Sequence, residues 1–174
     1  MRKLLSPEVF GILFLAVITA TAYQAEPEPV KSNATLIEVV DGDTIDVESG
    51  GQEITIRLLG VDAPETNSAN TPQEFGLRDT FSNRRCLESY GERAAEFLEQ
   101  KLDSQIKYRT DSSADRRGEY GRLLAYVYED NSSVNRLLVE KGLARVYTGK
   151  FSREGIYLRQ EKQAKRKEKG LWSC

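Results

Sequence analysis

Three short β-rich segments follow one another between residues 34 and 60, with only tight turns between them. The first turn contains Asp41-Gly42-Asp43-Thr44, and the second contains Ser49-Gly50-Gly51. Such short turns join neighbouring antiparallel strands, so this stretch predicts a three-stranded β-meander. The predicted strands run from Ala34 to Val40, from Ile45 to Glu48 and from Glu53 to Gly60.

The third of these strands carries an arginine opposite its apolar face. Ile54, Ile56 and Leu58 share one face, because side chains in a strand alternate with a period of two. Arg57 therefore points to the other face, just before a turn at Gly60. We interpret Arg57 as a residue that is available to a ligand.

The rest of the chain alternates helical patterns with further strands. After a long polar segment from Thr66 to Cys86, Ser89-Tyr90-Gly91-Glu92 has the spacing of a capping box and predicts the start of a helix. The remaining predicted elements are strands from Gln105 to Thr110 and from Arg122 to Glu129, a short helix between Ser133 and Gly142, and a basic helix from Ser152 to Lys169. Five strands and three helices in this order predict an α+β fold, a five-stranded OB-fold-like β-barrel with two helices packed beside it.

The sequence contains no histidine and only two cysteines. This excludes Ser-His-Asp and Cys-His nucleophile systems, zinc sites built on imidazole, and a thiolate zinc cage. Any catalysis must therefore rest on carboxylates, arginines, tyrosines or lysines. Metal ligands drawn from such a set are oxygens, which favour the hard cations calcium and magnesium.

The N-terminus has the pattern of an export signal. Two basic residues precede an apolar run from Val9 to Ala22, which is shorter than the roughly 20 residues that span a bilayer. The run ends in Ala20-Thr21-Ala22, a small-x-small cleavage sequence. We therefore expect a secreted, extracellular protein, with an uncleaved anchor that leaves the domain facing outside as the alternative. The expected divisions are a signal peptide at residues 1–22, a flexible leader at 23–33 and a folded domain at 34–174.

Export bears on the two cysteines, Cys86 and Cys174. In an oxidising compartment two cysteines are more often paired than free, so we predict a disulfide between the polar loop and the last residue. Closing so long a loop would stabilise the fold by up to about 4 to 5 kcal/mol in the entropic description.

Three motifs occur in a fixed order along the expected domain. They are Asp41-Gly42-Asp43-Thr44, then Arg57-Leu58-Leu59-Gly60-Val61-Asp62-Ala63-Pro64-Glu65, then Glu119-Tyr120-Gly121-Arg122. Each alone is compatible with an ordinary turn or loop. Together, and with Gly170-Leu171-Trp172-Ser173 near the end, they resemble the staphylococcal nuclease (thermonuclease) family from about residue 34 to residue 173.

The resemblance implies a calcium site and a catalytic carboxylate. Asp43 and Asp62 match carboxylates that bind Ca²⁺, and Ala63 matches the position that contributes a backbone carbonyl. Glu65 matches the residue that activates or orients the attacking water. Since the chain has no histidine, a carboxylate is also the only plausible base in this cluster on chemical grounds.

The resemblance also implies residues that bind the substrate. Arg57 and Arg122 match the pair that contacts the phosphodiester as its charge shifts, and paired arginine hydrogen bonds suit such an oxyanion. Tyr120 and Tyr147 match tyrosines near the nucleotide. The implied function is hydrolysis of DNA and RNA with little sequence preference, which leaves 3′-phosphate ends.

Two further functions are compatible with the sequence. One is a catalytically silent OB-type module that binds nucleic acid, and the other is a structural cell-surface domain. The filled charged positions of the motifs favour the enzyme. We expect a monomer with DNA and RNA as substrates and no protein partner, and a membrane contact only where the N-terminal segment is uncleaved.

Three departures from the family pattern affect what is carried over. Glu119 stands where the best-known member has a lysine beside the nucleotide, which bears on affinity and on the preferred end of the substrate. Ala63 replaces a threonine, a change of little effect if only its carbonyl binds. The loop from Asn67 to Cys86 is longer, and it reshapes the expected entrance to the site.

Overall fold

The computed structural model describes residues 32–66 and 69–174. The expected signal peptide and nearly all of the expected leader lie outside these residues. Within the described part of the chain, no helix is long and apolar enough to cross a membrane.

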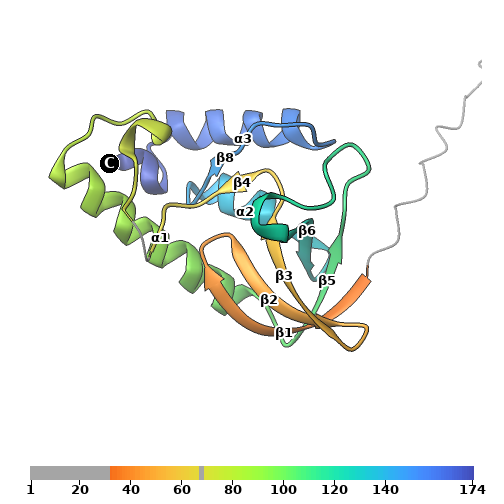
Figure 1. Cartoon of the computed structure of the whole chain (residues 1–174). Coiled ribbons are helices and arrows are strands. Elements are labelled where there is room, and N and C mark those ends of the chain that lie inside the picture. The colour runs from red at the N-terminus through yellow and green to blue at the C-terminus, as the bar shows by residue number, and fades with distance from the viewer. Residues whose placement is uncertain (1–31, 67–68) are drawn as a thin grey trace, which may run out of the picture.

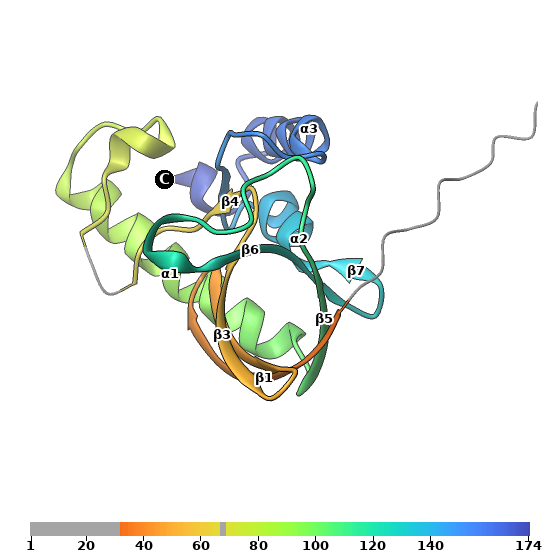
Figure 2. The same cartoon turned by 45° about the vertical axis from the view of Figure 1, so that its right-hand side comes forward.

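Five strands form a closed barrel, as Figure 2 shows in a view along it. Antiparallel pairs join four of its five seams, and a parallel pair between β3 and β6 closes the fifth. The barrel strands are β1 (Ser32–Asp41), β2 (Thr44–Ser49), β3 (Gln52–Leu58), β5 (Gln105–Arg109) and β6 (Leu123–Glu129). The predicted α+β class with an OB-like barrel and three helices is confirmed.

Three short strands lie outside the barrel wall. β7 (Ser132–Ser133) extends the sheet from β6. β4 (Val61–Asp62) and β8 (Arg145–Val146) form a separate antiparallel pair, in which Asp62 lies opposite Arg145. β4 follows β3 in the chain and β8 lies between the last two α-helices, so this pair joins distant parts of the sequence.

The barrel core follows the predicted period of two. Ile56 and Leu58 of β3 are fully buried with Ile45 and Val47 of β2, whereas Arg57 between them lies on the other face. Burial of such side chains is the main favourable term in folding, about 25 cal/mol per Å² of apolar surface. The alternation therefore fixes which face of β3 presents Arg57.

The first helix is longer than predicted. α1 (Phe81–Lys101) begins after Thr80, whose side chain accepts a hydrogen bond from the Asn83 amide at 3.1 Å. The prediction that Ser89 opens this helix is wrong, and Cys86 lies on the helix rather than in a loop. The first two turns are polar and carry a single buried side chain, Leu87, so they lack the apolar periodicity on which the prediction depended.

The expected long loop before α1 is partly ordered into a helical turn. η1 (Pro72–Phe75), a 3₁₀ helix, buries Phe75 against Leu87 of α1 and Leu171 near the C-terminus. This small apolar cluster packs the segment onto the rest of the domain.

Two helices pack together on the C-terminal side of the barrel (Figure 1). α2 (Val134–Lys141) begins after Ser133 and ends at Gly142, as predicted. α3 (Glu154–Arg166) is shorter at both ends than the predicted span from Ser152 to Lys169. Before the helix, the Ser152 amide donates a hydrogen bond to the Asp111 carboxylate at 2.7 Å. After the helix, Glu168 has a positive φ of 48°, which is not a helical conformation.

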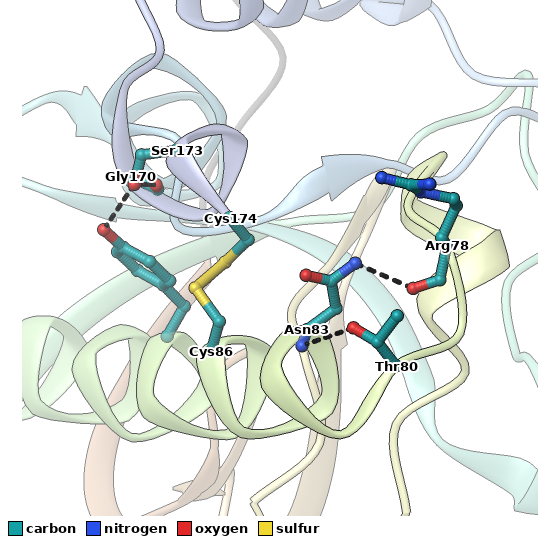
Figure 3. The surroundings of a disulfide bond; sticks show 8 residues. Arg78, Thr80, Asn83, Cys86, Gly170, Ser173 and Cys174 are labelled. Carbon is teal, nitrogen blue, oxygen red and sulfur yellow. Dashed lines mark hydrogen bonds between the residues drawn. A yellow bond between two sulfur atoms is a disulfide. The ribbon is translucent and has the colours of Figure 1, made fainter.

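The C-terminus is bound to both α1 and α2. Leu171, in the 3₁₀ helix η3 (Gly170–Ser173), donates its amide hydrogen to the carbonyl of Gly142 at 2.8 Å. Cys86 and Cys174 form a disulfide with their Cα atoms 5.9 Å apart (Figure 3). The predicted partners are thus bonded in the structure, but the bond joins the chain end to a helix instead of to a loop.

Candidate active site

Arg57 lies between two carboxylates. Its Nη2 donates to Oδ1 of Asp62 at 2.7 Å, and its Nη1 is in close contact with Oδ1 of Asp43. Burial lowers the pKa of Arg57, and the Asp62 and Asp41 carboxylates oppose that shift. The guanidinium remains a cation, because arginine stays protonated in proteins, and it is held in place from both sides.

The Asp-Gly-Asp-Thr turn fixes the position of Asp43. The Asp43 side chain accepts hydrogen bonds from the Ala63 amide at 2.8 Å and from the Thr44 hydroxyl at 3.1 Å, and the residue is only 4% exposed. Asp41 accepts from the Asp43 amide at 2.9 Å, as expected of an Asx turn. At Gly42 a Cβ would lie 2.7 Å from that of Ala63, so the turn packs closely against the next motif.

Asp41 belongs to the same charged cluster, although sequence reasoning gave it no role. Burial raises the pKa of Asp41, and the cationic Arg57 and Arg122 partly reverse that shift. The carboxylate therefore lies within electrostatic reach of both arginines. The sequence feature that could have indicated this role is the position of Asp41 at the start of the Asp-Gly-Asp-Thr motif.

Arg145 is a second cationic partner of Asp62. Its Nη2 lies 2.7 Å from Oδ2 of Asp62 and 3.2 Å from Oε2 of Glu74. Asp62 thus has an arginine on each carboxylate oxygen, with Arg57 on the other. Sequence reasoning missed Arg145, because its contact depends on the pairing of β4 with β8, which are more than 80 residues apart.

Glu65 is exposed, but its backbone is fixed by Asn70. Oδ1 of Asn70 accepts from the Glu65 amide at 2.8 Å, and Nδ2 donates to the Glu65 carbonyl at 3.0 Å. From the other side, α1 approaches so closely at Gly91 that a Cβ there would lie 2.5 Å from the carbonyl oxygen of Pro64. Neither Asn70 nor Gly91 was assigned a role from the sequence.

Arg57 and Arg122 line one pocket of about 430 Å³, together with Tyr147. The parallel pairing of β3 with β6 brings them together, since Arg57 lies near the end of β3 and Arg122 directly precedes β6. The positive charge of Arg122 contributes to the lowered pKa of Arg57, so the two cations act on the same space.

Arg122 has fewer polar contacts than Arg57. Its buried Nε has no hydrogen-bond partner among the described residues, and no carboxylate in residues 32–66 or 69–174 forms a salt bridge with it. Its guanidinium lies 5.6 Å from the ring centroid of Tyr120. Tyr120 itself is 90% exposed at a backbone φ of 62°, so it stands at the rim while Tyr147 lines the pocket.

The other predicted site residues line an adjacent pocket of about 180 Å³. Asp62, Ala63 and Glu65 form part of its wall with Asn70. Val61 lines the first pocket, and its neighbour in the chain, Asp62, lines the second. Arg57 and Arg122 therefore line one pocket, and Glu65 lines the other.

The residues proposed for a metal fit a hard cation in their chemistry. Asp43 and Asp62 both contact the Arg57 guanidinium, and the amide of Ala63 joins residue 63 to Asp43. Oxygen donors of this kind, completed by water, suit calcium. In the described residues no three His, Cys, Asp or Glu side chains form a group able to hold a metal ion. The carbonyl role of Ala63 stays a prediction.

The fold and the site define an OB-type barrel protein with an arginine pair beside a cluster of carboxylates. Residues 55–174 match the family model described as Staphylococcal nuclease homologue. The chain belongs to this family. The matched residues include Arg57, Asp62, Glu65 and Arg122, whereas Asp43 precedes them.

Individual relatives agree with this assignment. The chain is 37% identical over 145 residues to the uncharacterized protein MJ1439 of Methanocaldococcus jannaschii, which covers 79% of this chain and 70% of that protein. It is 32% identical over 168 residues to the thermonuclease of Staphylococcus hyicus, with 90% of each chain covered. It is 36% identical over 144 residues to the endonuclease YncB of Bacillus subtilis, and the match covers 81% of this chain and 62% of that protein. Family membership supports a nuclease, a hydrolase that acts on nucleic acids.

Proposed function

We propose that this protein is an exported, calcium-dependent nuclease that hydrolyses phosphodiester bonds of DNA and RNA with little sequence preference and leaves 3′-phosphate ends. The observation that carries the proposal is the convergence of Arg57 and Arg122 on one pocket. Two guanidinium groups that line one pocket beside a carboxylate cluster can bind a phosphodiester anion and stabilise the charge that it gains in the transition state.

The two arginines have different parts in this function. Arg57 is held by Asp43 and Asp62, so its orientation is set before a substrate arrives. Arg122 has no salt-bridge partner among the described residues and keeps its donors for the substrate. Loss of one donor of this kind lowers turnover by about 10² to 10³ in other enzymes.

Glu65 is the proposed general base. Its backbone is bound by Asn70 and its carboxylate is exposed, so it can accept a proton from a water molecule in the adjoining pocket. A positioned carboxylate contributes about 10² to 10⁴ in rate to such a step.

Asp43, Asp62 and the carbonyl of Ala63 would hold the calcium ion. When bound, calcium supplies Lewis-acid polarisation of a phosphoryl oxygen and neutralises its charge. Few protein ligands make a weak site, and an affinity of about 0.1 to 1 mM matches the calcium that is available to extracellular proteins. Export thus supports the choice of calcium, as the family resemblance does.

A catalytically silent nucleic-acid-binding module is the alternative. It would keep the barrel and the arginines but would not cut its ligand. The test is incubation of the purified mature protein with plasmid DNA and with RNA, in calcium or in an excess of chelator. Degradation of both that the chelator abolishes supports the proposal, and binding without degradation in calcium supports the module.

A further inference from the structure

The pocket that holds Arg57 and Arg122 also has two carboxylates on its wall. Asp115 and Glu119 line it together with Arg117. All three belong to the connection between β5 and β6. These carboxylates lower the positive charge that the pocket presents to a phosphate group.

This acidic wall has a defined backbone. The Gly118 amide donates to the Arg122 carbonyl at 3.0 Å, and the Leu124 amide donates to the Arg116 carbonyl at 3.1 Å. Residues 116–118 therefore run antiparallel to the start of β6, and the turn η2 (Glu119–Gly121) forms the tip of this hairpin.

The base of the hairpin is also fixed. The carboxylate of Asp111 accepts hydrogen bonds from the Tyr126 hydroxyl at 2.6 Å and from the amide and hydroxyl of Ser152 at 2.7 and 2.6 Å. The wall is thus tied both to the barrel and to the segment that leads into α3. These bonds fix the backbone around Asp115 and Glu119, whose side chains are exposed.

The charges of the pocket suit one kind of phosphate. Three arginines and two carboxylates line it, and the charge of Arg57 is further offset by Asp43 and Asp62. An internal phosphodiester carries one negative charge, whereas a terminal phosphate carries about −1.5 to −2 near pH 7. With the Arg57 charge offset in this way, the two other arginines of the lining are balanced by its two carboxylates. A terminal phosphate, with its larger negative charge, would therefore meet more repulsion there than an internal phosphodiester.

We propose that Asp115 and Glu119 are specificity-determining residues that disfavour nucleotides with a terminal phosphate in this pocket. This inference rests on the proposed nuclease function. The enzyme would therefore cleave internal bonds and hydroxyl-ended strands in preference to bonds next to a phosphorylated end. Like charges repel more strongly at low ionic strength, so the preference would fall as salt is added.

The test compares kcat/KM for three DNA trinucleotides of one sequence, with hydroxyls at both ends, with a 5′-phosphate, or with a 3′-phosphate. Trinucleotides place either end within two nucleotides of the cleaved bond. We expect the wild type to cleave at least one phosphorylated form about three- to tenfold more slowly than the hydroxyl form, the scale of one or two exposed charge pairs. In Asp115→Asn/Glu119→Gln the difference disappears, and in Glu119→Lys it is reversed.

Glu140→Gln is the matched control, because it removes one exposed carboxylate that pairs with Arg136 on α2, away from the pocket. It should keep the wild-type preference. Equal rates for all three substrates with the wild type, or an unchanged preference in the double variant, would overturn the inference. Failure of the folded wild type to cleave any of the three and plasmid DNA in calcium would instead contradict the proposed function.

Discussion

Asn70 binds both backbone polar groups of Glu65, with its Oδ1 2.8 Å from the amide nitrogen and its Nδ2 3.0 Å from the carbonyl oxygen. Glu65, the proposed base, follows two buried residues, and no other group in the described residues hydrogen-bonds its backbone. The buried side-chain amide of Asn70 thus fixes the backbone of Glu65, as strand pairing fixes the backbone of Arg57.

Replacing Asn70 with alanine should therefore lower kcat more than it raises KM. The carboxylate of Glu65 would remain, but its position would be less defined, and a displacement of about 1 Å can cost about 10²-fold in rate. Steady-state kinetics in saturating calcium checks this. Asn83→Ala is a suitable control, since it also removes an amide that donates to a backbone carbonyl, that of Arg78 at 2.7 Å, and it should leave kcat unchanged. A raised KM with normal kcat would assign Asn70 to substrate binding.

Arg145 should weaken calcium binding, because it places a positive charge 2.7 Å from an oxygen of the proposed ligand Asp62. Arg145→Met keeps much of the side-chain bulk and removes the charge. We expect its half-maximal calcium concentration to fall about two- to fivefold, the effect of one partly exposed charge pair. Calcium titration of activity measures it, and Arg136→Met on α2 is the control. A higher calcium requirement would show that Arg145 chiefly orients Asp62.

The disulfide between Cys86 and Cys174 should contribute to stability. Its removal in Cys86→Ser/Cys174→Ser should lower the free energy of unfolding by about 2 to 5 kcal/mol. Denaturant unfolding with and without reductant measures the effect. Reductant should shift the wild type to the stability of the variant and leave the variant unchanged. A wild type that is indifferent to reductant under conditions that break the bond would contradict this role.

Asp111 should make the fold sensitive to acid. Desolvation raises its pKa, but hydrogen bonds from Ser152, Tyr126 and Ser113 outweigh this and hold the pKa below its ordinary value. Below about pH 4, where a free aspartate takes up a proton, the unfolded state therefore binds more protons than the folded state. Stability is fully present above that pH and is lost as the pH falls toward the folded pKa.

Asp111→Asn should accordingly lower stability at pH 7 and flatten the decline between about pH 4 and pH 2. Denaturant unfolding at a series of pH values measures both. Asp130→Asn, at an exposed turn position, is the control and should keep the wild-type profile. If the free energy of unfolding of Asp111→Asn fell with pH as it does in the wild type, Asp111 would not be the cause of the acid sensitivity.

Local patterns in the sequence predicted much of the barrel. The alternation around Arg57 and the turn at Asp41–Thr44 depend on neighbours in the chain, and the structure has both as expected. The start of α1 was missed because its first turns have little apolar surface. Contacts such as Asp62 with Arg145 depend on strand pairs far apart in sequence, where no local pattern reports the partner.

The joint action of Arg57 and Arg122 on one phosphodiester is tested most directly by kcat/KM of Arg122→Ala for single-stranded DNA in saturating calcium. The matched control is Arg166→Ala at the end of α3, which is exposed and does not line the pocket. We expect Arg122→Ala to lose about a hundredfold or more, with the fold intact by circular dichroism, while Arg166→Ala stays near the wild type. Wild-type kcat/KM in a folded Arg122→Ala would contradict the proposed site.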